Sequence, residues 1–141
     1  MNSSISSTSS YLDLAPLYGS NQEEQNTVRT FKDGLLKPDA FVESRILGFP
    51  PGVSVLLICF NRFHNYVATE LAAINEGNRF NVPDRQKILK MTRDAMPQSA
   101  SEQEVSSAAH KRYEAALTKL DNDLFQTARL YTREIILLTV G

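Results

Sequence analysis

The chain has 141 residues, of which 42% are apolar and 22% charged, and its formal net charge is −1 at pH 7. This composition is typical of a folded globular protein of about one domain, and it excludes an intrinsically disordered chain. Because the net charge is near zero and the basic residues are scattered along the sequence, we also expect no nucleic-acid partner.

The sequence shows no signal for export or membrane insertion. Residues 1–10 are rich in serine and have neither the basic nor the apolar region of a secretory signal. The longest apolar run, 53–60, is far shorter than the roughly 20 residues that a membrane-spanning helix needs, so we expect no transmembrane segment. The single cysteine, Cys59, excludes an internal disulfide, and its apolar neighbours predict that it is buried. A cytoplasmic or otherwise reducing location follows as the expectation.

Residues 1–52 are predicted to be mostly loops with one short helix, because glycine and proline interrupt every longer periodic pattern. The short helix is expected within residues 22–31. Glu23 and Glu24 lie in its first turn, where negative charge complements the helix dipole. Asp33 and Gly34 then predict a tight turn.

Residues 53–141 are predicted to be helical. The strongest helix is expected from near Val53 to residues 75–77, with Gly77 in the left-handed position after its end. The apolar residues that recur at helical spacing along it are Leu56, Phe60, Phe63, Val67, Leu71 and Ile74. We expect these side chains to face the core.

Three more helices are expected after this one. Residues 84–96 form a polar helix that begins after Pro83, and Ser101 and Glu104 form a capping box at the start of the next helix. A last helix begins at 121–123. Its expected buried residues are Leu124, Ala128, Tyr131, Ile135 and Leu138. The predicted fold class is therefore mainly α with an irregular N-terminal third, and the apolar residues 135–141 indicate a surface for a protein partner or a missing continuation.

The residues alone predict little catalytic chemistry. The chain has two histidines, His64 and His110, and lacks the common zinc, hydrolase and phosphate-loop motifs. His110 lies in a charged helical stretch and is expected in solvent. His64 lies among polar residues on the strongest helix, where it is a structural hydrogen-bonding residue, a metal ligand or a catalytic base. Asp121 and Asp123 are expected to cap the last helix.

A weak cation signal precedes the first turn. The Ser9 hydroxyl, the Tyr11 carbonyl and the Asp13 carboxylate could converge oxygen atoms on calcium. The alternative is that Ser9 and Asp13 cap the local backbone.

Three stretches, in this order, resemble the haem peroxidase and cyclooxygenase superfamily, and most closely its fungal fatty-acid dioxygenases, the linoleate diol synthases. The first is Tyr-Leu-Asp-Leu-Ala-Pro-Leu-Tyr-Gly at 11–19, followed by Phe-Lys-Asp-Gly-Leu-Leu-Lys at 31–37. The second is Arg-Phe-His-Asn-Tyr-Val at 62–67, which is similar to the Arg-Glu-His-Asn-Arg helix of the superfamily. The third is Asp-Leu-Phe-Gln-Thr-Ala-Arg-Leu at 123–130.

The resemblance implies a partial haem-peroxidase-like helical fold and an enzyme that adds dioxygen to linoleic or a related fatty acid in oxylipin biosynthesis. Its haem ligands, a distal and a proximal histidine, and a radical tyrosine three residues before the proximal one, would all lie outside this chain. His64 corresponds to the family's helix histidine and not to its iron ligand. We therefore assign no catalytic or haem-binding residue.

On this interpretation residues 1–141 are an internal fragment of a haem peroxidase-like dioxygenase domain, inactive alone. The alternative is a non-catalytic helical interaction module derived from the same scaffold. The resemblance also favours calcium, because Ser9, Tyr11 and Asp13 match the superfamily's calcium loop, although Ala15 departs from its last position.

Overall fold

The structure is a computed structural model that describes residues 14–42 and 50–140. Within these ranges it is mainly helical, as the sequence predicts, and contains no strand. The only β-type pairing among the described residues is an isolated antiparallel bridge between Arg29 and Leu36. The helices are α1 (Ala15–Tyr18), α2 (Gln22–Val28), α3 (Pro51–Ile74), a 3₁₀ turn (Glu76–Asn78), α4 (Arg85–Ala95) and α5 (Glu102–Val140).

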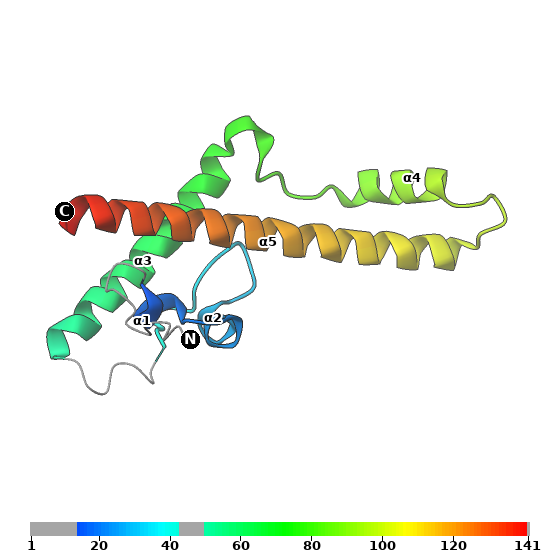
Figure 1. Cartoon of the computed structure of the whole chain (residues 1–141). Helices are drawn as coiled ribbons and strands as arrows, with labels where there is room; N and C mark the ends of the chain where they lie inside the picture. Colours follow the sequence, from blue (N-terminus) through cyan, green and yellow to red (C-terminus); the bar gives the residue numbers. More distant parts are fainter. Residues whose placement is uncertain (1–13, 43–49, 141) are drawn as a thin grey trace, which may run out of the picture.

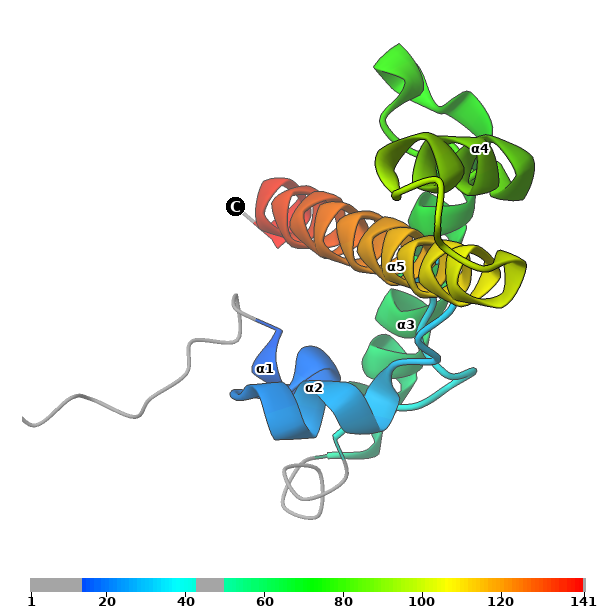
Figure 2. The same ribbon diagram turned by 90° about the vertical axis from the view of Figure 1, so that its right-hand side faces the viewer.

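Helix α5 is the axis of the structure. Figure 1 shows α4 beside its N-terminal half and α3 crossing its C-terminal half. Helices α1 and α2 lie on the opposite side of α5 from α4, as Figures 1 and 2 both show. None of the described helices has an apolar stretch long enough to cross a membrane.

The prediction of a helix break at 121–123 is wrong, because α5 runs without interruption from Glu102 to Val140. No glycine or proline occurs in this span, so nothing in the backbone forces a stop. Asp121 does not cap a helix end. Its carboxylate accepts hydrogen bonds from Arg29 and from the backbone of Gly34. The polar residues that suggested a boundary therefore serve tertiary contacts within one helix.

The predicted core face of α3 is only partly correct. Its four middle residues are half-buried, and Phe60 packs against the core, but Leu56 and Ile74 at its two ends are 54% and 70% exposed. The buried residues of the helix are Leu57, Asn61, His64 and Ala68. Two of these four are polar, so the side of the helix that packs inward is not its most apolar side. Cys59, expected to be buried, is exposed for the same reason.

Several local predictions are confirmed. A short helix forms at 22–28 with Glu23 and Glu24 in its first turn, and a helix forms at 85–95. Their caps, Asn21 and Asp84, were not predicted; each accepts a hydrogen bond from backbone N–H in the first turn. Ser101 and Glu104 form the reciprocal capping box. One short helix, α1, was not expected, and Asn75 rather than Gly77 takes the left-handed position directly after α3.

The core lies where the N-terminal segment packs into the crossing of α3 and α5. Its buried members are Leu14, Leu17, Tyr18, Val28, Leu36, Val42, Leu57, Phe125 and Ile136. Six of these nine residues come from residues 14–42, the part of the chain with the least regular structure. The irregular N-terminal third therefore supplies most of the side chains that join the two long helices.

Candidate functional site

The predicted calcium ligands Ser9, Tyr11 and Asp13 lie outside the residues that the structure describes, so the calcium site stays a prediction. Across 14–42 and 50–140, no group of three or more histidine, cysteine, aspartate or glutamate side chains is placed to hold a metal ion. The notable polar cluster of this part of the chain is instead a buried chain of hydrogen bonds at the α3–α5 crossing.

This chain of hydrogen bonds is centred on Gly34, in the loop that follows α2. Gly34 has a φ of 70°, which glycine adopts without strain. A Cβ atom at this position would lie 2.6 Å from the Cβ of Leu124 and 2.6 Å from the backbone nitrogen of Phe125. The backbone therefore touches α5 at a place where no larger residue fits. The Gly34 N–H donates to the Asp121 carboxylate over 2.7 Å.

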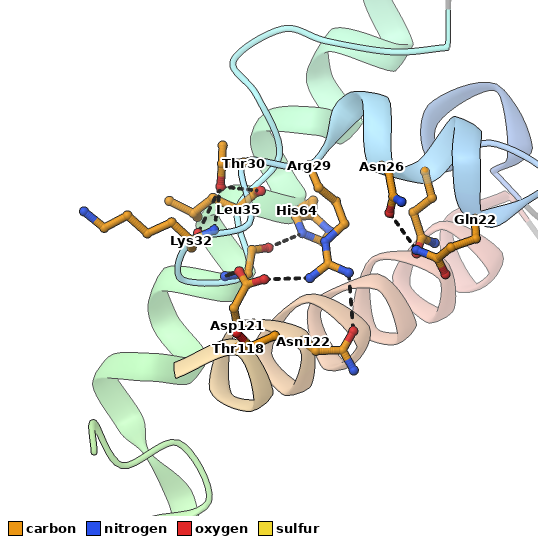
Figure 3. Close-up of polar contacts among 12 residues, drawn as sticks. Gln22, Asn26, Arg29, Thr30, Lys32, Leu35, His64, Thr118, Asp121 and Asn122 are labelled. Atoms are coloured by element: carbon orange, nitrogen blue, oxygen red, sulfur yellow. Dashed lines mark hydrogen bonds and ion pairs between the residues drawn. The ribbon is translucent and has the colours of Figure 1, made fainter. Parts of the chain in front are cut away.

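Arg29 and Asp121 form a buried ion pair on one side of Gly34. The guanidinium nitrogen lies 2.7 Å from the carboxylate oxygen, and the side chains are only 5% and 6% exposed. The guanidinium also donates to Asn122 over 3.3 Å and lies 4.2 Å from the ring centroid of Phe125. Figure 3 shows Arg29 reaching from the end of α2 to Asp121 and Asn122 on α5. Both charges thus have their hydrogen-bonding partners, as buried charges require.

His64 lies on the other side of Gly34 and is fully buried. Its Nε2 is 2.9 Å from the Gly34 carbonyl oxygen, and its Nδ1 is 2.7 Å from the Tyr18 hydroxyl. Because a carbonyl can only accept, Nε2 carries the proton and Nδ1 accepts from Tyr18. Burial lowers the pKa of His64 to about 4, although the Gly34 hydrogen bond acts in the opposite direction. His64 is therefore neutral at pH 7, with both ring nitrogens engaged.

The rings of Tyr18 and Phe125 pack against this histidine. The ring centroids of Tyr18 and His64 are 5.4 Å apart, and Phe125 lies 6.0 Å from Tyr18 and 5.3 Å from His64. Burial raises the pKa of Tyr18 well above its usual range, although a Thr132 hydrogen bond and the Arg129 charge act in the opposite direction. The phenol therefore stays protonated, and its O–H group donates a hydrogen bond to His64.

Two asparagines on the same face of α3 bind the loop backbone. The Asn61 amide donates to the carbonyls of Lys37 and Ala40. The Asn65 amide pairs with both the N–H and the carbonyl of Leu36, at 2.8 and 3.0 Å. Asn61, His64 and Asn65 are spaced by three and four residues, which places them on one side of the helix. This face holds the loop and α1 against the helix crossing.

The haem implied by the resemblance can be tested against these residues. Haem iron needs a free ring nitrogen or another axial donor, whereas both nitrogens of His64 are hydrogen-bonded and the residue is inaccessible. His110 is on the exposed surface of α5. His64 as placed therefore does not fit as a haem ligand.

An apolar groove opens on the same crossing, between the first half of α3 and the end of α5. Its volume is about 490 Å³, and its lining consists of Leu56, Cys59, Phe60, Phe63, Ile135, Ile136 and Thr139. No charged side chain lines it. Leu138 lies near the end of the same helix and is 82% exposed. The apolar end of the chain is thus only partly covered.

Comparisons with known proteins give the class of protein. The profile of the animal haem peroxidase family matches residues 1–50. The chain is 56% identical over 129 residues to Psi-producing oxygenase A of Emericella nidulans, and this match covers 92% of the chain but 10% of that protein. No solved structure matches the chain.

Two diol synthases match over the same span. The 7,8-linoleate diol synthase of Pyricularia oryzae is 55% identical over 92% of the chain and 9% of its own length. The linoleate diol synthase of Gaeumannomyces graminis is 52% identical over 91% of the chain and 9% of its own length. The chain is therefore homologous to a segment of haem-peroxidase-type oxygenases. Within that class its relatives are the fungal Psi-producing oxygenases and linoleate diol synthases, as the sequence resemblance indicated, and it spans about a tenth of their length.

Proposed function

We propose that this chain forms a structural segment of a haem-dependent fatty-acid dioxygenase, which adds dioxygen to linoleic or a related acid, and that the segment is inactive alone. The observation that carries the proposal is the 56% identity over 92% of the chain to an oxygenase of which the match covers 10%. The state of His64 supports a structural role, because a residue with both nitrogens engaged and no exposure cannot reach a substrate or an iron.

The contribution of the segment is to fix the angle between two long helices. The Gly34 loop is bound on one side to α5 through Asp121 and on the other side to α3 through His64. A 1 Å displacement of supporting residues is enough to reduce catalysis strongly. A rigid crossing would therefore position neighbouring parts of a larger enzyme.

A chimera tests this role. Residues 14–140 of this chain replace the homologous segment of Psi-producing oxygenase A, and linoleate oxygenation by the purified haem-loaded chimera is measured. We expect activity within about tenfold of the parent, because the contacts inside the segment are kept. The matched control carries Gly34→Val in the same chimera and should lose most activity. A folded, haem-loaded chimera without activity would contradict the proposal.

The isolated chain provides the complementary measurement. Supplied with haemin and linoleate, it should consume no oxygen above the rate of haemin alone. Haem-dependent oxygen uptake that depends on the folded chain would show that the segment is catalytic by itself, contrary to the proposal.

We also propose that Ser9, Tyr11 and Asp13 contribute to a calcium site in the longer enzyme. A hydroxyl, a carbonyl and a carboxylate are the oxygen donors that calcium prefers, and the residue pattern supports their convergence. For this test the chimera is extended to begin at Ser9, so that all three residues come from this chain. Asp13→Asn in the extended chimera should lower calcium retention, measured by metal analysis after dialysis, and unchanged retention would contradict the proposal. Glu23→Gln, at an acidic residue outside the pattern, is the control.

A second candidate is a non-catalytic interaction module, expected in the cytoplasm. The observation that favours it is the apolar groove between α3 and α5, together with the exposed Leu138. Light scattering of the purified chain tests for self-association, which Leu138→Glu should reduce. A monomer with unchanged behaviour in both forms would remove this candidate.

A further inference from the structure

Tyr18 and His64 are paired in a way that the proposed scaffold role does not use. Their hydrogen bond of 2.7 Å is as short as a strong hydroxyl bond, and the two side chains are 1% and 0% exposed. With Nε2 protonated, Nδ1 of the neutral imidazole offers a free electron pair to the phenol, which also has a hydrogen bond with Thr132. Water does not reach either group.

We propose that Tyr18 and His64 form a redox-active pair, in which loss of an electron from Tyr18 transfers its phenolic proton to Nδ1 of His64. The electron passes to an outer-sphere one-electron oxidant of high potential. The O–H bond of Tyr18 breaks and an N–H bond forms at Nδ1. The products are a neutral tyrosyl radical, an imidazolium ion and the reduced oxidant.

The geometry supports this step because a phenol that has lost an electron is a strong acid and must release its proton to a base in contact with it. In a buried site, that base has to be a side chain already hydrogen-bonded to the phenol. His64 occupies this position, and its Nε2–H remains bonded to the Gly34 carbonyl when Nδ1 gains the proton. No side chain has to move for the transfer.

The surrounding charges favour return of the proton when the electron returns. Arg29 and Arg129 both disfavour a positive charge on His64. Asp121 lies on the far side of the Gly34 peptide and favours it. Tyr18 itself lies 5.4 Å from the Arg129 guanidinium. The protonated form of His64 is therefore unfavourable once the radical is reduced. The proton then returns to Tyr18, so the transfer is reversible.

Phe125 separates the pair from other reactive groups. Its ring meets both Tyr18 and His64 edge to face or tilted, and it is fully buried. A radical on Tyr18 would thus be shielded from solvent, substrate and other chains. We expect it to be long-lived compared with radicals on Tyr66 or Tyr131, which are 61% and 51% exposed.

The test uses the purified full chain, in which Tyr18 is made the one remaining tyrosine. The substitutions are Tyr11→Phe, Tyr66→Phe, Tyr113→Phe and Tyr131→Phe. Photogenerated tris(bipyridine)ruthenium(III) serves as the oxidant, and frozen samples are examined by electron paramagnetic resonance. We expect a tyrosyl radical signal that disappears when Tyr18→Phe is added. The absence of a radical in the single-tyrosine chain, or an equal signal without Tyr18, overturns the proposal.

His64→Gln tests the role of the base. Glutamine can accept from Tyr18 and donate to Gly34, but it cannot hold the proton. The rate of Tyr18 oxidation should fall about a hundredfold at pH 7, the lower end of general-base effects. An unchanged rate in a variant with a native circular dichroism spectrum overturns the pairing.

A measurement without any change at His64 covers the case in which that variant does not fold. In heavy water, the Tyr18 radical should show one strongly coupled exchangeable deuteron, detected by electron–nuclear double resonance. Absence of that coupling overturns the proposal. Because the oxidant is supplied externally, these outcomes are independent of whether the chimera oxygenates linoleate.

Discussion

The two halves of α5 are held by different kinds of contact. From its middle to its C-terminal end, α5 packs against α3 and is bound to Arg29 and the Gly34 loop through a buried polar group distant in sequence, Asp121. At the N-terminal half, α4 packs beside the helix as the other arm of a local hairpin. Its polar contacts there include Arg112 to Thr92 at 3.2 Å and an exposed ion pair between Arg93 and Glu102.

The difference predicts unequal stability along one helix. The crossing is constrained by buried charges and by a glycine in contact with the α5 backbone, so any local change there is costly. The hairpin contains a buried residue, Thr92, but no buried ion pair among the described residues; its ion pair between Arg93 and Glu102 is exposed and contributes little. The crossing should therefore unfold only with the whole protein, whereas the hairpin opens first.

The largest expected effect comes from breaking the buried ion pair. Asp121→Ala leaves the Arg29 charge and the Gly34 N–H without their partner, and should lower the free energy of unfolding by about 3–5 kcal/mol in urea titrations. The matched control is Asp123→Ala in the same helix. Its pair with Lys119 is exposed and should contribute less than about 1 kcal/mol. Equal effects of the two changes would mean that burial does not distinguish the crossing.

The next effect is the pH dependence caused by His64. Its pKa is about 4 in the folded protein and about 6.5 in an unfolded chain. Because the folded-state pKa is the lower one, the stabilisation is complete above pH 6.5 and is lost as pH falls towards 4. The loss should reach about 3 kcal/mol at pH 4.

The measurement is urea denaturation between pH 7 and pH 4. In His64→Gln the decline over this range should be smaller by that amount, whereas His110→Gln, at an exposed histidine, should leave it unchanged. If the free energy of unfolding fell equally with pH in both variants, the acid sensitivity would come from groups other than His64.

Glycine substitutions separate crowding from backbone strain. Gly34→Ala must accept a positive φ and a contact of 2.6 Å with α5, and should cost about 2–3 kcal/mol. Gly77→Ala has a similar φ of 62° but open space around the added Cβ, so only the strain of about 1 kcal/mol remains. Thermal unfolding of the two variants measures the difference. Similar melting temperatures would show that the loop moves away from α5 without cost.

The sequence predicted the local structure of this chain better than its tertiary contacts. The Ser101–Glu104 capping box depends on residues three positions apart, so its pattern is visible in the sequence. The fully buried side of α3 was missed because hydrophobic periodicity takes account of apolar side chains alone. Asn61 and His64 are buried through hydrogen bonds to a loop more than 20 residues away.

The candidate site was only partly predictable for the same reason. The cluster around His64 was correctly expected to make hydrogen bonds, whereas its partners Tyr18 and Gly34 could not be inferred from spacing. Asp121 was mistaken for a cap. A carboxylate between two apolar stretches gives the same sequence pattern whether it caps a helix or forms an ion pair with a residue distant in sequence. Arg29 gave no signal at all. A buried ion pair is recognised only when both partners are placed.

The smallest predicted effect tests whether the hairpin is independent of the crossing. Asp84 accepts from the N–H groups of Gln86 and Lys87, and Asp84→Ala should weaken α4 by about 1 kcal/mol. Hydrogen exchange should then become about fivefold faster for α4 amides, since 1 kcal/mol corresponds to that factor. The control is Asp94→Ala, at an exposed residue of the same helix that caps nothing.

The informative readout of this variant lies at the other end of α5. If the halves are independent, amides near Phe125 and Ala128 exchange at the same rate in Asp84→Ala and in the parent chain. Acceleration there by the same factor as in α4 would mean that α5 unfolds as one unit. The contrast between a rigid crossing and a separately opening hairpin would then be wrong, because an uninterrupted helix would transmit the loss along its whole length.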